Sequence, residues 1–148
     1  MPCPMPRTID FTTILLYNSA MPRTDVIYYR DANGSVPVLD WLEEVGRRDH
    51  RAVEKCAARI DLLRQYGHEL RRPSADYLRD DIHELRVRVG RVQFRLLYFF
   101  HGRNALVLAH GLVKEKEVPN VDIERALARK RLFVHAPKRH TFREESHG

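Results

Sequence analysis

Hydrophobic and polar positions alternate most clearly between residues 83 and 100. Apolar side chains occupy positions 85, 87 and 89 and, after Gly90, positions 92, 94, 96, 98 and 100. Two alternating runs separated by a glycine are typical of a β-hairpin with one buried face. The pattern therefore predicts two strands joined at Gly90, with aliphatic and aromatic side chains buried together on one side.

The opposite face of this predicted hairpin is rich in arginine. Its arginines are Arg86, Arg88, Arg91 and Arg95. Residues 83–103 contain five arginines and a single acid, Glu84, which leaves a net charge of +4. Because a guanidinium group can donate two parallel hydrogen bonds to a phosphate, this face suits a partner that carries phosphate.

A strand and two helices are predicted before the hairpin. Residues 25–30 are rich in strand-forming side chains and lead into an Asn-Gly turn signal. A helix is predicted to open at Ser35 and Pro37 and to end at Gly46. Apolar residues at helical spacing predict a second helix over residues 48–66.

The other segments differ in composition and periodicity. Residues 68–82 lack a clean period and contain a proline, which indicates an ordered connection. Residues 105–113 are almost wholly apolar, as expected for a central strand that is covered on both faces. A last helix is predicted to begin at Pro119-Asn120, with acids in its first turn and basic residues in its last. Residues 133–148 contain a proline and three histidines and are expected to form a flexible, solvated tail.

The element order β-α-α-β-β-β-α predicts an α+β fold. We expect a small, mostly antiparallel sheet with the two N-terminal helices packed on it and a C-terminal helix. A chain of 148 residues can bury one such core. The predicted domain spans residues 25–132, with an extension or arm at residues 1–24 and the tail at residues 133–148.

The N-terminal extension repeats a short motif. The sequence Met-Pro-Arg-Thr occurs at residues 5–8 and again at residues 21–24. A match of this length is too short to indicate a structural repeat. Two alternatives follow: either Met21 is the functional start of the protein, or residues 1–20 form a real N-terminal arm.

Composition limits the class of protein and of partner. The formal net charge of +6 favours an anionic partner, most simply a nucleic acid, although such basicity can also serve solubility alone. Cys3 and Cys56 form neither a disulfide framework nor a metal set and suit a reducing cytoplasm. No run approaches the eighteen or so apolar residues of a membrane span, so we expect no membrane partner and a cytoplasmic location. The tail histidines lack metal-ligand spacing, and no metal or other cofactor is expected.

An ordered set of short motifs resembles a known family. The motifs are His83-Glu84-Leu85-Arg86, Arg95-Leu96-Leu97-Tyr98-Phe99-Phe100, His110-Gly111-Leu112-Val113-Lys114, Pro119 and Ile123-Glu124-Arg125-Ala126. Together they resemble the phage-derived HigB-like branch of the RelE/ParE toxin superfamily, over about residues 25–132. The resemblance implies a RelE-like fold.

The resemblance also implies a function and partners. It implies the toxin of a type II toxin–antitoxin pair, acting as a metal-independent, ribosome-associated mRNA endonuclease (an mRNA interferase). Such an enzyme promotes attack of an RNA 2′-hydroxyl on the adjacent phosphate. Its partners would be mRNA, the ribosome and a cognate antitoxin of the helix-turn-helix type.

The chain departs from the family after its last predicted strand. Many relatives carry two adjacent lysines there, whereas here Glu115 separates Lys114 from Lys116 and Glu117 follows. The acids reduce the local positive potential. Two other functions therefore stay open: a non-catalytic, ParE-like inhibitor of gyrase, and an inactive prophage relative that retains only antitoxin binding.

The chemistry of RNA cleavage assigns roles to the basic residues. Attack by the 2′-oxygen requires a base near that hydroxyl, an acid near the leaving 5′-oxygen and positive charge around the phosphorane. Arg86 and Arg95 are predicted to contact the phosphate and to stabilise the transition state. Lys114 and Lys116 are predicted to complete the catalytic set.

A second group of residues is predicted to bind RNA without reacting. This group is Arg71, Arg72, Arg88, Arg91 and His83. For Arg86 and Arg95 the alternative is a solvated cross-strand pair, or a pairing with Glu84 or Asp81. His110 and Tyr98 are expected to lie in the core, because both belong to predicted buried strand positions.

Overall fold

The predicted α+β architecture is confirmed by the computed structural model, which describes residues 23–114 and 116–144. In chain order the elements are β1 (Asp25–Tyr29), α2 (Pro37–Arg48), α3 (His50–Tyr66), a 3-10 turn (Gly67–Glu69), β2 (Ala75–Arg79), β3 (Ile82–Val89), β4 (Val92–His101), β5 (Ala105–Val113), α4 (Asn120–His135), a 3-10 turn (Pro137–His140) and β6 (Thr141–Phe142). The segment that holds the Met-Pro-Arg-Thr repeat lies almost wholly outside the described residues.

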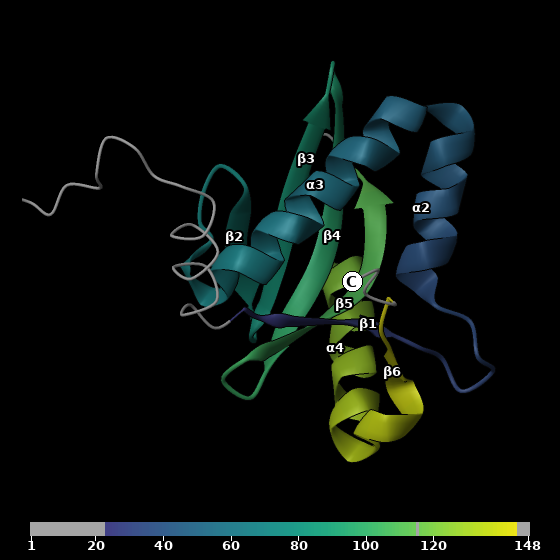
Figure 1. Ribbon diagram of the computed structural model, residues 1–148, viewed down its shortest axis with the longest axis vertical. Coiled ribbons are helices and arrows are strands. Elements are labelled where there is room, and N and C mark those ends of the chain that lie inside the picture. Colours follow the sequence, from purple (N-terminus) through teal and green to yellow (C-terminus); the bar gives the residue numbers. More distant parts are fainter. Residues whose placement is uncertain (1–22, 115, 145–148) are drawn as a thin grey trace, which may run out of the picture.

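Six strands form one sheet in the order β2-β3-β4-β5-β1-β6. All neighbouring strands are antiparallel except β1 and β5, which are parallel. Helices α2 and α3 pack on one face of the sheet and α4 packs on the other, as Figure 1 shows. The domain therefore has three layers, with the sheet in the middle.

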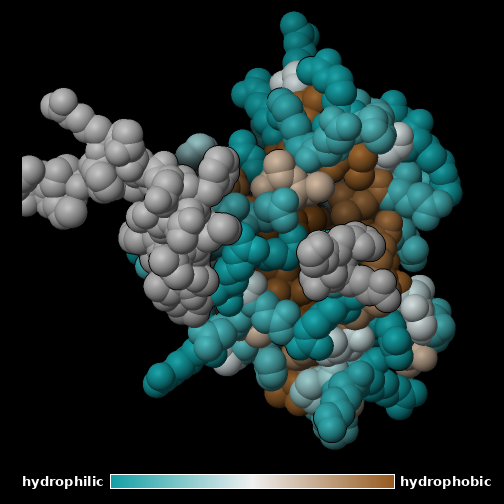
Figure 2. Space-filling model, in the orientation of Figure 1, coloured by the Kyte–Doolittle hydropathy of each residue, from teal (hydrophilic) through white to brown (hydrophobic). Residues whose placement is uncertain are grey.

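The face under α2 and α3 follows the predicted alternation. Leu85 and Val87 from β3 and Phe94, Leu96 and Tyr98 from β4 are buried there. Cys56 is also buried in this layer, and burial raises the pKa of its thiol to about 11. Figure 2 shows hydrophobic residues gathered between α2 and α3 and hydrophilic residues over their outer surfaces. This layer is the larger of two cores.

The other face of the sheet is apolar over only part of its area. Leu97 and Phe99 on β4 lie beneath α4, where they pack with Val107 on β5. Polar residues take the same face of β4 farther from the α4 contact, at Gln93 and Arg95. The second half of β4 is continuously apolar because both of its faces are covered, and the first half is polar on one side because α4 does not reach it.

The segment after residue 132 is not a flexible tail as far as the structure describes it. Helix α4 continues to His135, and Phe133 is buried against Phe99. Strand β6 then pairs with β1, and the buried ring of His140 lies against Tyr29 and is hydrogen-bonded through Nδ1 to the Arg30 carbonyl oxygen. The prediction was wrong for residues 133–144 because a two-residue strand has no period to detect.

Two further predictions of local structure need correction. The connection predicted over residues 68–82 contains β2, which forms one edge of the sheet. Its polar residues hid the strand, as is common for edge strands. Helix α2 does not end at Gly46 but at Arg48, and Asp49 caps the start of α3 through its carboxylate.

Candidate functional site

A groove of about 470 Å³ opens on the face of the sheet that α4 leaves uncovered. We call it the arginine groove. Residues of β2, β3 and β4 line it, together with the segment that leads into α4. Its polar lining consists of Arg72, Asp76, Arg79, Glu84, Arg86, Gln93, Arg95, Lys116 and Glu117. Three of the four residues predicted as catalytic, Arg86, Arg95 and Lys116, are therefore in one concave site.

The centre of the arginine groove is a buried carboxylate between two arginines. Arg95 Nη1 donates to Glu84 Oε2 at 2.7 Å, and Arg86 Nε lies 3.4 Å from Glu84 Oε1. The sheet register explains the cluster: Glu84 and Arg86 are two residues apart on β3, and Arg95 is the cross-strand partner of Arg86. Glu84 offsets the repulsion between the two guanidinium groups.

The two arginines differ in exposure. The Arg95 side chain is only 6% exposed and also donates to Gln93 Oε1 at 3.1 Å, whereas the Arg86 side chain is 36% exposed. The structure therefore contains the alternative in which the arginines pair with Glu84. The Arg95–Glu84 ion pair is buried rather than solvated. Of the two arginines, Arg86 is the one that a ligand in the groove can reach.

The two predicted catalytic lysines separate after β5. Lys116 lines the arginine groove, beside Glu117. Lys114 is exposed at the end of β5 and is not part of the groove lining; its backbone N–H donates to the Gln93 carbonyl oxygen. Of the two lysines, only Lys116 therefore lines the arginine groove.

One wall of the groove is an ion-paired contact between β2 and α4. Arg79 donates to Asp80 and, across the groove wall, to Glu124 at 2.9 Å and to Asn120. On the other side, Arg72 donates twice to Asp76 Oδ2, at 2.9 and 2.6 Å. This hydrogen bond lowers the pKa of Asp76 and raises the pKa of Arg72.

Arg71 and His83 do not line the arginine groove. Both line a second pocket on the α3 side of the sheet, where Arg72 is also present. Burial of the His83 ring is the main cause that lowers the pKa of His83, and the neighbouring His68 lowers it further.

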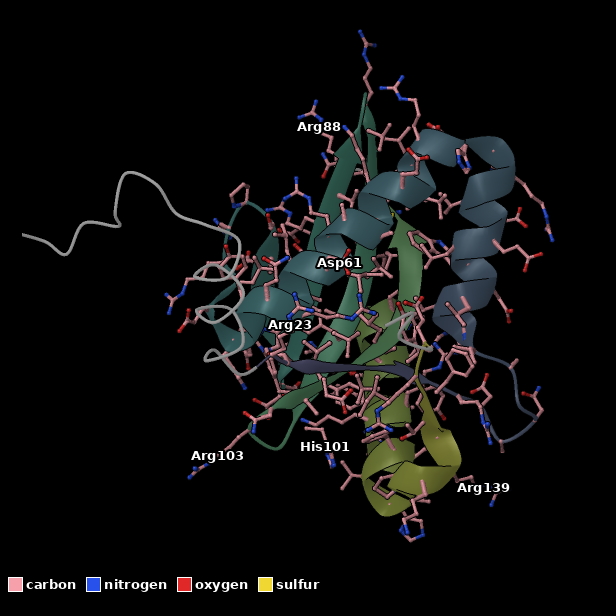
Figure 3. All side chains as sticks on the ribbon, viewed as in Figure 1. Arg23, Asp61, Arg88, His101, Arg103 and Arg139 are labelled. Carbon is pink, nitrogen blue, oxygen red and sulfur yellow. The ribbon has the colours of Figure 1, made fainter. Side chains whose placement is uncertain are left out.

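The remaining predicted RNA-binding arginines lie near the hairpin tip. Arg88 is exposed, and its Nε donates to the Gly90 carbonyl oxygen, while Arg91 is exposed in the turn. Figure 3 shows Arg88 at one end of the sheet and Arg103 at the other. The charge of +4 counted over residues 83–103 is therefore divided among separate places.

His110 lies beneath α4 and outside the groove lining. The side chain is buried, and its Nε2 is 3.3 Å from Asp122 Oδ1. Burial and then Arg129 lower the pKa of His110 to about 4, and Asp122 offsets this only in part. Its Nδ1 finds no partner among the described residues, so the predicted core histidine is only half satisfied.

Sequence reasoning missed part of the groove. Glu84 was detectable, because a residue two positions from Arg86 on a strand shares its face. Asp76 and Arg79 were not detectable, because the sequence pattern predicts a connection where β2 lies. Within residues 23–114 and 116–144, no group of three or more His, Cys, Asp or Glu side chains is arranged to hold a metal ion. Over the same residues, no helix has the length and apolar character to cross a membrane.

Comparison with known proteins assigns the family. Residues 41–131, more than half of the chain, match the family described as Phage derived protein Gp49-like (DUF891). The matched region runs from α2 into α4 and includes every strand that lines the arginine groove. No curated protein matches the chain. The chain therefore belongs to the phage-derived Gp49-like family, which is associated with RelE/ParE-like toxins.

Proposed function

We propose that this protein is the toxin of a type II toxin–antitoxin pair, of the HigB-like branch, and that it cleaves mRNA in the arginine groove. The observation that carries the proposal is the convergence of Arg86, Arg95 and Lys116 from three separate segments on one concave site. A phosphodiester that enters this groove meets cations on more than one side, as phosphorane stabilisation requires.

Arg86 is the proposed phosphate-binding residue. Its Nε is near Glu84, and its side chain is exposed enough for the terminal guanidinium nitrogens to donate to the non-bridging phosphate oxygens. As the 2′-oxygen attacks phosphorus and negative charge grows on these oxygens, the hydrogen bonds strengthen. The rate then depends on how well the Arg86 guanidinium is held in place.

Arg95 is proposed to act through Glu84 rather than on the substrate. Each Glu84 oxygen is near one guanidinium group, so the carboxylate holds both arginines instead of accepting the 2′-hydroxyl proton. This makes Glu84 and Arg95 positioning residues. The proposal thus gives Arg86 and Arg95 different roles, because the Arg95 side chain is buried and the Arg86 side chain is exposed.

Lys116 is the proposed proton-transfer residue in the groove. As the 2′-oxygen bonds to phosphorus, its proton passes to solvent water in the open groove. An ammonium group at this site donates a proton to the leaving 5′-oxygen as the P–O5′ bond breaks, which leaves a 2′,3′-cyclic phosphate and a free 5′-hydroxyl. Lys114, at the margin, is proposed to contact the RNA backbone. The chemistry needs no metal, because cations of the protein supply the charge.

The proposal is tested by induced expression of the full chain with mapping of cellular mRNA ends. We expect growth arrest together with new in-frame cuts that carry 5′-hydroxyl ends. Arg86→Ala is expected to abolish both effects. Arg103→Ala is the matched control, since it removes the same charge from the far end of the sheet and is expected to leave both unchanged.

Other outcomes separate the alternatives. Arrest without mRNA cuts would contradict the nuclease and favour a ParE-like inhibitor of gyrase, which a supercoiling assay on plasmid DNA would detect. No arrest would contradict the toxin and favour an inactive relative that only binds antitoxin. We also expect a neighbouring gene to encode a helix-turn-helix antitoxin, and its co-expression to relieve the arrest.

A further inference from the structure

A second cavity, of about 440 Å³, lies on the α3 side of the sheet beyond the end of that helix. We call it the aromatic pocket. Its rings are those of His68, Tyr77, His83, Tyr98 and Phe100, which come from the turn after α3 and from β2, β3 and β4. The proposed cleavage reaction does not use this pocket.

The sheet register builds a row of rings across three strands. Tyr77 pairs with His83 between β2 and β3, and His83 pairs with Tyr98 between β3 and β4. The His83 and Tyr98 rings are stacked with their centroids 5.2 Å apart, and Tyr77 meets His83 edge-on at the same distance. Since the backbone fixes these positions, the row exists before any ligand arrives.

The pocket has a buried floor and an exposed rim. Tyr98 at the floor is buried, and the His68 ring is stacked on Phe100 with centroids 3.6 Å apart. Tyr77 at the rim is 54% exposed, so a ligand in the pocket can reach its side chain. Flat walls with polar ring edges suit a flat heterocycle, because aromatic faces stack on any base.

The aromatic pocket and the arginine groove meet at the edge strand β2. Arg72, Asp76 and Tyr77 line both cavities, and the exposed Arg71 extends the positive charge along the pocket. A single-stranded nucleic acid presents a phosphate and a base in each nucleotide. A strand that passes the edge at β2 can therefore leave a phosphate in the groove and a nearby base in the pocket.

We propose that the aromatic pocket is a nucleobase subsite, in which Tyr77 stacks on a base close to the phosphate held in the arginine groove. The inference rests on the proposed RNA-cleaving function and adds to it the place where the base is held. It commits to single-stranded RNA as the occupant, because arginines and aromatic rings occur together at this edge.

The test measures binding without cleavage. Short 2′-O-methyl oligoribonucleotides have no free 2′-hydroxyl to attack the phosphate, so their affinity for the full chain can be followed by fluorescence anisotropy. One abasic site is moved along the oligonucleotide from one end to the other. At one position we expect the abasic site to weaken binding by roughly tenfold, the usual effect of losing one stacked base.

Variants connect this loss to Tyr77. In Tyr77→Ala we expect the intact and abasic oligonucleotides to bind equally, at the lower affinity. Tyr77→Phe keeps the ring but loses the hydroxyl that accepts from the Asp81 N–H, so it should retain the tenfold difference. Tyr66→Ala is the matched control: Tyr66 is 49% exposed at the end of α3 and does not line the pocket.

The outcomes distinguish this inference from the proposed function. If the abasic penalty is absent, or is the same in wild type and Tyr77→Ala, the pocket does not hold a base and the inference is overturned. A Tyr77-dependent penalty in a protein that cuts no RNA would support the subsite and contradict only the nuclease. Cleavage of mRNA with base-independent affinity would contradict only the subsite.

Discussion

At the scale of single residues, the arginine groove depends on a difference between two cross-strand arginines. Arg95 is buried with Glu84, and Arg86 reaches the open groove. Removing one member of a buried pair leaves the other charge without compensation, which is strongly destabilising. An ion pair with an exposed member contributes little.

We predict that Arg95→Ala lowers the free energy of unfolding by about 3 kcal/mol, because it leaves the Glu84 carboxylate buried without its main partner. Arg86→Ala, its cross-strand neighbour, should cost less than about 1 kcal/mol. Urea denaturation of both variants measures the difference. Equal losses would show that Arg95 does not hold Glu84 in the way its burial indicates.

This asymmetry was not available from the sequence. Alternation places Arg86 and Arg95 on the same face of a hairpin, and both positions look equivalent in a period of two. What separates them is how far other segments cover that face, which is a tertiary property. The position of Glu84 beside Arg86, in contrast, is predictable from the sequence, because residues two apart on a strand share a face.

At the scale of elements, α2 is held against β5 at a glycine. A Cβ atom built on Gly111 would lie 2.3 Å from the ring of Trp41, so the indole lies directly on the backbone of the strand. In contrast, a Cβ built on Gly46 within α2 would lie 3.6 Å from Val53, an ordinary contact. A side chain therefore has no room at Gly111, whereas a methyl group fits at Gly46.

We predict opposite effects of adding a methyl group at these two positions. Gly111→Ala should destabilise the protein by about 1–3 kcal/mol, because Trp41 must move, and should shift its fluorescence. Gly46→Ala should stabilise it by roughly 0.5–1 kcal/mol, as alanine favours the helix. Trp41 is the only tryptophan, which makes the fluorescence reading specific. A neutral Gly111→Ala with unchanged fluorescence would contradict the close contact.

A second element-scale contact connects β5 to α4 and should make stability depend on pH. His110 on β5 faces Asp122, Arg125 and Arg129 on α4, and its pKa is lowered to about 4. In the unfolded chain a histidine titrates near pH 6.5. Between these values the unfolded state binds more protons than the native state, so stability rises with pH.

We predict that the free energy of unfolding falls by up to about 3 kcal/mol as the pH drops from 6.5 towards 4. His110→Gln, which has no titrating ring, should lose most of this dependence. Urea denaturation of both proteins across that range measures it. If the free energy of unfolding falls equally in wild type and in His110→Gln, the pH dependence belongs to carboxylates and not to His110.

Elements with a long, regular period were predictable, and those without one were not. Helix α3 and the β3-β4 hairpin follow directly from their apolar spacing. Strand β2 escaped because an edge strand mixes polar and apolar residues, and β6 because its two residues gain their structure only from pairing with β1. The part of the candidate site on the β3-β4 hairpin was predictable from the sequence. The residues that β2 contributes to its wall were not, because β2 itself was not predicted.

At the scale of the whole molecule, net charge and its placement give different expectations for RNA binding. The net charge of +6 belongs to the entire surface. The cations that line the arginine groove converge on one site, whereas Arg88 and Arg103 lie at opposite ends of the sheet. The number of counterions released on binding depends on how many phosphates the protein contacts, and not on its net charge.

The salt dependence of affinity therefore separates placement from net charge. We predict that Arg86→Ala makes the slope of log affinity against log salt shallower by about 0.7, the value for one contact to a single strand. Arg103→Ala removes the same charge and should keep the wild-type slope. Anisotropy titrations with 2′-O-methyl RNA over a range of salt concentrations measure both. Equal changes of the slope in the two variants would mean that RNA responds to the overall field of a basic protein. They would contradict the proposal that the arginine groove binds the phosphate.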